Sequence, residues 1–372
     1  MLVTGVEMRD FRTYNRASAR LGSGLTVVHG ANGAGKSNLL EALYFGCTGR
    51  SPRTRNDREM VAFGAKATRV TVSLFEDAQQ HELAVGYSVP VPGEPAVKRM
   101  WSDGAPAERL LDLPLRPLIS VFLPERLELL KGAPAVRRAH LDQLVAALWP
   151  ARAEIRREYA QVLAQRNALL ARIRAGRAGR AALATWDREL AVKGVALMTL
   201  RSEAVDLLAE PFSRRCELLG LSGRAALEYR PRSGAADADE LVAELQARLQ
   251  TDLERGFSGH GPHRDELAIL REERELRVYG SQGEQRLALL GLLLAERGLL
   301  AAERGRTPLM LLDDVMSELD AQRRGQLADE LATGGQSVIA TTDLSHVPGA
   351  ADHAVTRLRV STGAILQEVI AA

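Results

Sequence analysis

A glycine-rich loop near the start of the chain and an acidic pair near its end could together hold a nucleotide. Residues 30–37 fit the pattern GxxxxGK[ST], in which glycines let backbone N–H groups approach phosphate oxygens. The start of the following helix would add its positive end to the same anion. The phosphate-binding residues that this pattern predicts are Gly30, Ala31, Asn32, Gly33, Ala34, Gly35, Lys36 and Ser37.

Two side chains of this loop and two later carboxylates have predicted chemical roles. Lys36 would reach the β- and γ-phosphates of ATP, and the Ser37 hydroxyl would ligate Mg²⁺. Residues 309–312 form a buried-strand pattern that ends in Asp313 and Asp314. In enzymes with this loop the acid that closes such a strand holds Mg²⁺, which suits Asp313, and Asp314 would orient or deprotonate the attacking water. Lys36, Asp313 and Asp314 are therefore the predicted catalytic residues.

The sequence around these residues distinguishes them from chance matches. The apolar run 24–29 leads into the loop, and the helix-compatible stretch 37–43 follows it. An accidental glycine-rich turn would have neither neighbour, and a solvated strand end would have no phosphate loop to accompany it. The nucleotide site is thus expected to be built from two distant parts of the chain, with a long insertion between them.

The remaining periodicities predict strands near both ends of the chain. Strands are expected at 3–8, 25–29, 69–75, 82–89, 97–101, 118–122, 266–270, 276–279, 308–313, 337–341, 354–360 and 364–369. A further helix is expected at 237–254.

The middle of the chain has the spacing of a helical hairpin. Apolar residues three and four positions apart predict helices over 155–173 and 186–207, with a reversal at 175–180. The polar residues Arg166 and Lys193 fall on the predicted seam, which suits a short coiled coil better than a long one. We expect an antiparallel hairpin that projects from a globular head, and a compact helical lobe is the alternative.

The order of these elements predicts an α/β fold with an inserted domain. The head would combine residues 1–125, which carry the phosphate loop, with residues 256–372, which carry the acidic strand. Residues 126–255 would form an all-helical arm that contains the hairpin.

Composition narrows the class of protein. The 372 residues are enough for two or three domains. We expect no signal peptide and no membrane span, because no basic-then-apolar leader and no window of about 18 uncharged apolar residues occurs. The two cysteines lack metal-ligand spacing, which favours a reduced, cytoplasmic compartment.

The net charge of +2 conceals a strongly basic stretch. Residues 137–180 hold ten Arg against three acids, a local charge of +7 (10 − 3). Such a stretch is typical of a nucleic-acid-binding surface and also of a solvated helix face, and the charge alone favours neither. No aromatic interleaving in this stretch suggests base stacking, so any binding of nucleic acid should be independent of sequence and sensitive to salt.

Several segments resemble known ATPases. Residues 281–285, Ser-Gln-Gly-Glu-Gln, resemble the signature motif of ABC-type ATPases, which also lies shortly before the acidic strand. Residues 317–320 resemble the loop that crosses the dimer interface in that superfamily. The whole chain resembles the RecF family, which is related to SMC-type heads. That resemblance rests on residues 10–14, 33–42, 124–125, 131–134, 137–138, 261–265 and 311–320.

The resemblance implies an ABC/SMC-type P-loop ATPase head with mixed β-sheets, and a homodimer that sandwiches two ATP–Mg²⁺ molecules. Ser281 and Gly283 of one protomer would then complete the ATP site around Lys36 of the other. It also implies a DNA-repair role at double-stranded DNA beside single-strand gaps or junctions, with RecO and RecR as partners. RecA would be loaded onto strands coated by single-strand-binding protein. The candidate DNA contacts are Arg137, Arg138, Arg152, Arg156 and Arg157.

Two positions depart from the wider ABC pattern. Asp314 stands where Glu is usual, and Thr341-Thr342-Asp343 stands where a switch His is usual. Both departures imply slow, DNA-stimulated hydrolysis that acts as a switch. An SMC-like chromosome protein would need a longer arm, and a transporter subunit would need a glutamine loop, for which only Pro124-Glu125 occupies the place.

Two histidines and the first predicted turn remain open. His260 and His263 have no acid or Cys at metal-ligand spacing, so a turn before the strand 266–270 is favoured over a metal site, and an interface or DNA role is also open. Arg12 and Asn15 follow the first strand and would either contact the nucleotide or lie in a surface loop.

Overall fold

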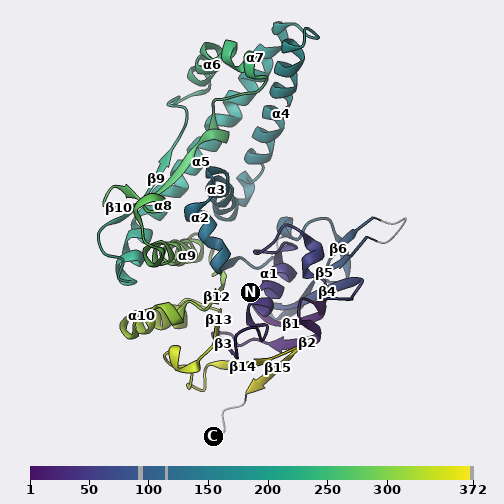
Figure 1. The fold of residues 1–372 in the computed structure, drawn as a ribbon. Coiled ribbons are helices and arrows are strands. Elements are labelled where there is room, and N and C mark those ends of the chain that lie inside the picture. The colour runs from purple at the N-terminus through teal and green to yellow at the C-terminus, as the bar shows by residue number, and fades with distance from the viewer. Residues whose placement is uncertain (91–94, 114–115, 369–372) are drawn as a thin grey trace. The chain divides into compact units, whose positions relative to one another are not determined.

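The computed structural model describes residues 1–90, 95–113 and 116–368 and divides into two compact units (Figure 1). The head unit comprises Met1–Leu127, Leu218–Gly220 and Leu300–Ala372, and the arm unit comprises Glu128–Glu217 and Leu221–Leu299. Both units are discontinuous in sequence, so the chain leaves each one and later returns to it.

The unit boundaries differ from those expected from the sequence. Residues 256–299, expected in the head, belong to the arm unit, because β10 (Glu266–Arg271) pairs along its whole length with β9 (Ala225–Arg230). The arm is also not all-helical, since these two strands and β11 (Arg274–Glu275) form a sheet in the order β11-β10-β9.

An antiparallel sheet forms one layer of the head unit, in the order β2-β1-β4-β5-β6-β7. Its strands are β1 (Leu2–Phe11), β2 (Tyr14–Arg20), β4 (Ala67–Glu76), β5 (Gln79–Ser88), β6 (Val97–Ser102) and β7 (Ala105–Ala107). Burial alternates along β4, where Val70, Val72 and Leu74 face inward. One face of this sheet is therefore apolar and available for packing.

The second sheet of the head unit is mostly parallel and has the order β15-β14-β3-β13-β12-β8. Its strands are β3 (Leu25–His29), β8 (Ile119–Phe122), β12 (Leu309–Asp313), β13 (Ser337–Thr341), β14 (Thr356–Ser361) and β15 (Ala364–Glu368). Only the β14–β15 pair is antiparallel. Because β3, β12 and β13 run in parallel, their carboxyl ends meet at one edge, where loops can build a ligand site.

Helix α1 (Lys36–Thr48) joins the two sheets, because one hydrophobic core includes residues of the helix and of both sheets. Gly46 makes this packing close: a Cβ there would lie 2.4 Å from Val72 Cγ2 on β4. Since α1 begins at the glycine-rich loop, its packing also fixes the position of that loop. The other helical segments of the head unit are η1 (Asp57–Met60), η2 (Leu110–Asp112), η3 (Pro124–Leu127), η7 (Met316–Glu318), α10 (Ala321–Thr333) and η8 (Leu344–His346).

The arm unit is built mainly from helices (Figure 1). They are α2 (Glu128–Lys131), α3 (Pro134–Leu148), η4 (Pro150–Arg152), α4 (Ile155–Arg174), η5 (Arg180–Ala182), α5 (Leu183–Leu218), α6 (Ala238–Ala247), α7 (Leu249–Arg255), η6 (Pro262–Arg264), α8 (Leu276–Tyr279) and α9 (Gln282–Arg304). In the described part of the chain, no helix is long and apolar enough to cross a membrane.

The expected antiparallel hairpin is present as α4 and α5. Tyr159 on α4 packs with Leu190 and Leu197 on α5, as the heptad spacing predicts. Helices α6 and α7 pack against the same hairpin, since Leu245 and Leu253 join its apolar clusters. The hairpin is therefore the centre of a small helical domain and not a free coiled coil.

The polar seam residues have ion-pair partners. Arg166 is fully buried and pairs with Asp187 on α5 at 2.7 Å and with Asp252 on α7 at 2.8 Å. Lys193 pairs with Glu158 at 2.7 Å near the surface. The α4–α5 seam is thus specified by charge pairing as well as by apolar contacts.

Other local predictions differ from the structure. Residues 276–279, expected as a strand, form α8, and the helix expected over 237–254 is interrupted at Arg248. Strands β2, β7, β9 and β11 were not expected. The last residue of the expected strand 364–369 lies outside the described residues.

Candidate nucleotide site

The glycine-rich loop links β3 to α1, as the sequence predicts, and two of its glycines are required by the local packing. Gly30 has φ 155°, and a Cβ there would lie 2.2 Å from the Val360 carbonyl oxygen. Gly35 has φ 116°, and its carbonyl accepts a hydrogen bond of 2.9 Å from the Tyr14 hydroxyl. A side chain at either position would force the loop away from its neighbours.

Lys36 and Ser37 occupy the start of α1 and point to different partners. The Lys36 ammonium donates to the carbonyls of Gly30 at 2.8 Å and Ala31 at 3.0 Å, so it lies over the loop. Burial lowers the pKa of Lys36, and the charges of the two nearby aspartates oppose that shift. The Ser37 hydroxyl donates to Asp313 Oδ2 at 2.6 Å. The structure therefore brings together the two halves of the site that the sequence predicts.

The two acids at the end of β12 have different environments. Burial raises the pKa of the Asp313 carboxyl, and the charge of Asp314 adds to this, whereas Ser37, Lys36 and Arg53 lower it. Asp314 is exposed, and its φ of 48° places it in the left-handed region of a turn. Its N–H donates to the Ala340 carbonyl at 3.0 Å, which ties the turn to β13. A half-buried carboxyl that is costly to ionise is suited to binding a cation.

The donor set near Ser37 fits Mg²⁺. A hydroxyl oxygen and a carboxylate oxygen are the hard ligands that this ion prefers, and it keeps other positions for water and phosphate oxygens. Among the described residues, no group of three or more His, Cys, Asp or Glu could hold a metal by itself. The site is consequently suited to an ion that arrives with a nucleotide.

Arg12 lies beside α1 and pairs with a carboxylate that sequence reasoning missed. Glu41 is fully buried, and Arg12 binds it through two hydrogen bonds of 2.9 and 2.7 Å. The Ser51 hydroxyl donates to the same carboxylate at 2.6 Å. Arg12 is therefore not in a free surface loop, and its predicted contact with the nucleotide stays a prediction. Its guanidinium braces α1 one turn after the phosphate loop.

Arg53 is a second residue that the sequence did not single out. Its guanidinium donates to Asn38 Oδ1 at 3.0 Å and to Glu125 at 3.2 Å, and it lies 3.3 Å from Glu41. Glu125 stands in η3, at the place expected for a glutamine loop. The only signal in the sequence is an arginine in the loop after α1, which is too common to be diagnostic. Arg53 nevertheless acts on Asp313, because its charge lowers the pKa of that carboxyl.

A hollow of about 560 Å³ opens beside the glycine-rich loop. That volume is in the range of small-molecule sites. The hollow is lined by His29, Gly30, Ala31, Asn32, Gly33, Ala34, Thr342, Arg359, Val360, Ser361, Thr362 and Glu368. Five predicted phosphate-binding residues thus face one accessible space in the head unit.

The segment after β13 holds polar groups where the ABC pattern has a histidine. The Thr341 hydroxyl donates to the Asp343 carbonyl at 3.0 Å, and the Asp343 carboxylate accepts from the Ser345 N–H at 2.8 Å. That hydrogen bond lowers the pKa of Asp343. The segment is therefore a capped turn with a carboxylate that stays ionised.

The signature-like segment lies at the start of α9 in the arm unit. The Ser281 N–H donates to the Glu284 carboxylate at 2.8 Å, and the Glu284 N–H donates to Ser281 Oγ at 3.3 Å, which is a capping box. Ser281, Gln282 and Gly283 are exposed. A capped, exposed helix start is a favourable place for an anion.

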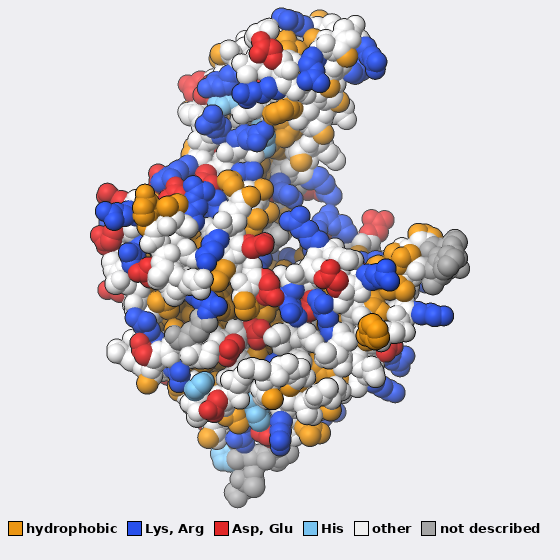
Figure 2. All heavy atoms as spheres, viewed as in Figure 1, with side chains coloured by type: hydrophobic (Ala, Val, Ile, Leu, Met, Phe, Trp, Pro, Cys, Tyr) orange, Lys and Arg blue, Asp and Glu red, His pale blue; other side chains and the backbone are white. Residues whose placement is uncertain are grey.

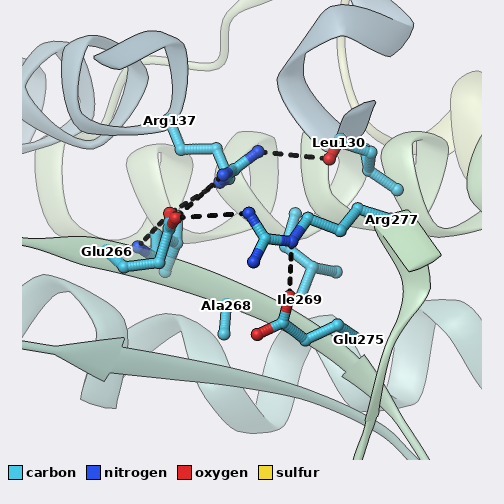
Figure 3. Close-up of a pocket in the computed structure, with 8 residues that line it drawn as sticks. Leu130, Arg137, Glu266, Ala268, Ile269, Glu275 and Arg277 are labelled. Carbon is cyan, nitrogen blue, oxygen red and sulfur yellow. Dashed lines mark hydrogen bonds and ion pairs between the residues drawn. The ribbon is translucent and has the colours of Figure 1, made fainter. Parts of the chain in front are cut away.

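The five candidate DNA contacts are not equivalent. Arg137 is only 2% exposed, and its guanidinium points at Glu266, with hydrogen bonds of 2.7 and 2.9 Å, and at the Leu130 carbonyl (Figure 3). Its burial counts against a contact with DNA. Arg138 is partly buried, and the other three candidates, Arg152, Arg156 and Arg157, are exposed.

The two histidines of the 256–265 segment have structural roles. His260 lies against the Glu244 carboxylate. His263 Nδ1 accepts from the Tyr159 hydroxyl at 2.7 Å, and Nε2 donates to the Ser258 carbonyl at 3.0 Å. The segment is thus the turn that was favoured over a metal site.

Comparison with known proteins identifies the family. A family model described as an AAA domain matches residues 6–88. The DNA replication and repair protein RecF of Herpetosiphon aurantiacus is 35% identical over 382 residues, with 98% of this chain and 99% of the relative covered. RecF of Myxococcus xanthus is 37% identical over 366 residues, with 94% and 93% covered. The chain belongs to the RecF family of DNA replication and repair proteins.

Solved structures agree with this assignment and confirm the fold. A recombination mediator RecF–ATP structure of the RecFOR pathway matches this RecF-family chain with a TM-score of 0.85 and 27% identity, with 99% and 97% of the two chains covered. An SMC head bound to the C-winged helix domain of ScpA has a TM-score of 0.61 at 16% identity, which supports the fold alone. The predicted ABC/SMC-type P-loop head is confirmed.

Proposed function

We propose that this RecF-family protein is a weak, DNA-stimulated ATPase that works as a dimeric clamp in the cytoplasm. Two copies would close on two ATP molecules, bind duplex DNA near single-strand gaps, and separate after slow hydrolysis. The observation that carries this proposal is the hydrogen bond between Ser37 and Asp313, which assembles a phosphate loop and an acidic strand in one place. The related RecF–ATP structure supports ATP as the nucleotide.

The head unit offers the groups that ATP and Mg²⁺ require. The N–H groups at the start of α1 and the Lys36 ammonium would neutralise phosphate oxygens. Ser37 and Asp313 would hold Mg²⁺, which when bound would offset the negative charge of the β- and γ-phosphates. Lys36 donates to two carbonyls and forms no ion pair with any described residue, so it can turn to a phosphate without breaking one.

We expect slow hydrolysis because of the groups that would contact the attacking water, Asp314 and the turn after β13. Asp314 is exposed at the end of β12 and would orient the attacking water, but its side chain is one methylene shorter than a glutamate. The turn after β13 presents Thr342 and Asp343, and the Thr341 hydroxyl already donates to a backbone carbonyl. The switch position itself, Thr341-Thr342-Asp343, holds no imidazole, so we expect the site to favour a long-lived ATP state.

The signature segment would act on the ATP of a second copy. Ser281 and Gly283 lie at the exposed start of α9, and nothing approaches Gly283 within 4 Å of a Cβ position. A γ-phosphate could therefore approach the N–H groups of this helix start. Ser281 and Gly283 would complete the site around the partner's loop and make dimerisation depend on ATP.

DNA and protein partners follow from the family and from charge. The related RecF structures are described as recombination mediators of the RecFOR pathway, which supports RecO and RecR as partners and RecA loading on strands coated by single-strand-binding protein as the outcome. The basic stretch 137–180 lies in the arm unit, so we expect this unit to contact duplex or gapped DNA.

An SMC-like structural role is the second candidate, because the SMC head shares the fold. The length of the arm argues against this role. Helix α4 has 20 residues, which corresponds to about 30 Å at 1.5 Å per residue. An arm of that length cannot embrace two distant DNA segments.

The dimer proposal is tested by light scattering with ATP, ADP or no nucleotide. We expect ATP alone to convert monomer to dimer, and we expect Lys36→Arg to abolish that change. Lys193→Arg makes the same substitution at a half-buried lysine of the arm, which pairs with Glu158, and should dimerise normally. A dimer that forms equally without nucleotide would contradict the sandwich.

The DNA proposal is tested by fluorescence anisotropy with duplex, single-stranded and gapped DNA at two salt concentrations. We expect ATP to strengthen binding to duplex and gapped DNA, and added salt to weaken it. Equal affinity with and without ATP would contradict the clamp.

A further inference from the structure

The segment 259–265 of the arm unit surrounds a fully buried carboxylate, Asp265. This carboxylate accepts from Arg201 at 3.0 Å, from the backbone N–H of Arg232 at 2.8 Å, and from the Tyr229 hydroxyl. Arg201 also binds Asp142 at 2.8 Å. The negative charge of Asp265 is therefore neutralised inside the arm and does not reach the surface.

Three arginines meet on the outer side of Asp265. Arg138 donates to the Asp265 carbonyl at 2.8 Å, and Arg264 precedes Asp265 in the chain. The backbone N–H of Arg232 donates to the Asp265 carboxylate at 2.8 Å, so this residue lies beside Asp265 as well. Burial lowers the pKa of Arg138, and the charges of Arg201 and Arg264 lower it further, as expected for neighbouring cations. We call Arg138, Arg232 and Arg264 the Asp265 patch.

The charge of this region is not balanced by acids. Six arginines (137, 138, 156, 201, 232 and 264) surround three acids (Asp142, Asp265 and Glu266), a local charge of +3 (6 − 3). The acids pair with Arg137, Arg156 and Arg201. In the described part of the chain, no carboxylate forms an ion pair with a member of the Asp265 patch.

The surroundings of the patch favour an extended anion over a small ligand. The neighbouring cavity, lined by Arg137, Glu266 and Arg277, holds only about 10 Å³, too little for a nucleotide (Figure 3). The Arg264 guanidinium lies 5.8 Å from the ring centroid of Phe257, which is 41% exposed. Figure 2 shows more Lys and Arg than Asp and Glu side chains over the end of the arm that carries α6 and α7. An outer surface of this kind suits a run of phosphates.

We propose that the Asp265 patch binds the sugar–phosphate backbone of duplex DNA, with one guanidinium for each of three phosphates. This inference rests on the proposed DNA-binding function and adds the surface that carries it. Guanidinium groups bind phosphate oxygens through paired, charge-assisted hydrogen bonds, and such contacts carry no sequence information. The Arg138 guanidinium is already held by the Asp265 carbonyl, so little of its side-chain freedom is lost when DNA binds.

The test uses a double variant and a control that is matched in charge. Arg232→Gln/Arg264→Gln removes two exposed charges and leaves the backbone contact to Asp265 intact. Arg188→Gln/Arg214→Gln removes two exposed charges of the same unit that already pair with Asp239 and Glu210. Both variants and the wild-type protein are measured by anisotropy on a duplex of arbitrary sequence, with ATP, over a series of salt concentrations.

We expect the patch variant to bind duplex DNA at least about tenfold more weakly at low salt than the control does. The slope of log K against log salt should also fall by about 1.8, which is about 0.9 for each lost phosphate contact. ATP-dependent dimerisation should be unchanged in both variants, which shows that the fold and the nucleotide site are intact.

Two failures are distinguishable. If wild-type protein binds no DNA, the proposed function itself is wrong. If wild-type protein binds DNA and the patch variant matches the control in affinity and salt slope, the inference is overturned. The patch would then be assigned to an acidic protein surface.

Discussion

The core of the arm and the nucleotide site of the head both enclose charged side chains, but they pair them differently. In the arm, Arg166 and Arg201 each have two carboxylates within hydrogen-bonding distance. At the nucleotide site, Lys36 donates to two backbone carbonyls and Asp313 accepts from a hydroxyl, and neither forms an ion pair within the described part of the chain. A buried charge with an opposite charge beside it stabilises a fold against unpairing, whereas a buried charge without one is available to a ligand. We therefore infer that the paired charges of the arm stabilise its fold, and that the charges at the nucleotide site bind ATP.

Removing a partner in the arm should have the largest effect on stability. Asp187→Ala leaves the fully buried Arg166 without one of its two carboxylates. We expect the free energy of unfolding to fall by about 3–5 kcal/mol, because an uncompensated buried charge remains. Chemical denaturation measures this loss. Glu210→Ala, which breaks an exposed pair with Arg214, is the control and should change it by less than about 1 kcal/mol. Similar losses for both variants would contradict the structural reading of the arm.

The arm should also lose stability in acid through His263. Burial lowers the pKa of His263 from 6.5 to about 4, so the folded protein keeps this imidazole neutral while the unfolded chain protonates it. Its contribution is complete above pH 6.5 and is lost as the pH falls towards 4, by about 3 kcal/mol in total.

Unfolding curves of the wild-type protein and of His263→Gln between pH 7 and 4 measure this contribution. Gln can keep one donor and one acceptor but does not titrate. We expect the variant to lose stability less steeply over that range, and parallel curves would show that His263 does not control the acid response.

In the head, neutralising a charge should leave stability intact. Burial raises the pKa of the Asp313 carboxyl, so the folded state disfavours its ionised form. Asp313→Asn should therefore keep or raise the free energy of unfolding, by less than about 1 kcal/mol, while ATP hydrolysis is lost. Denaturation and phosphate release are measured on the same preparation. If the free energy of unfolding falls by several kcal/mol instead, Asp313 stabilises the fold as the paired charges of the arm do, which contradicts the comparison.

The smallest expected effect concerns Arg53. Its positive charge lowers the pKa of Asp313, so Arg53→Gln should let that pKa rise. We expect ATP–Mg²⁺ binding to weaken a few-fold at neutral pH and its acid midpoint to move to higher pH. Glu125→Gln removes the other partner of Arg53 but keeps the guanidinium charge, so it should shift the midpoint less. Identical acid midpoints in the wild-type protein and Arg53→Gln would show that Arg53 does not control the pKa of Asp313.

The parts of the site that could be predicted are those formed by short, continuous motifs in the sequence. The phosphate loop and the acidic strand each carry their own pattern, and the parallel pairing of β3, β13 and β12 brings them together. The helical hairpin was predictable for the same reason, because its spacing repeats over several turns. A feature can therefore be predicted from the sequence when the residues that define it are close together in the chain.

The parts that escaped prediction depend on distant partners. The contact of Arg53 with Glu125 spans 72 positions, and that of Arg137 with Glu266 spans 129. A basic run does not show which arginine will turn inward to meet a carboxylate so far along the chain. Residues 276–279 failed for another reason, since four residues of mixed polarity do not distinguish a strand from one helical turn.

The most direct test of the central claim, that Ser281 of one copy completes the ATP site of the other, mixes two inactive variants. Lys36→Ala disables the loop, and Ser281→Arg disables the signature segment, so neither homodimer should hydrolyse ATP. In a mixed dimer both defects fall in one composite site and the second site is intact. Equal mixing should therefore restore at most about half of the wild-type DNA-stimulated rate, because a mixed dimer has one of its two sites intact. A mixture that stays as inactive as its components would show that each copy uses its own signature segment, and the account would be wrong.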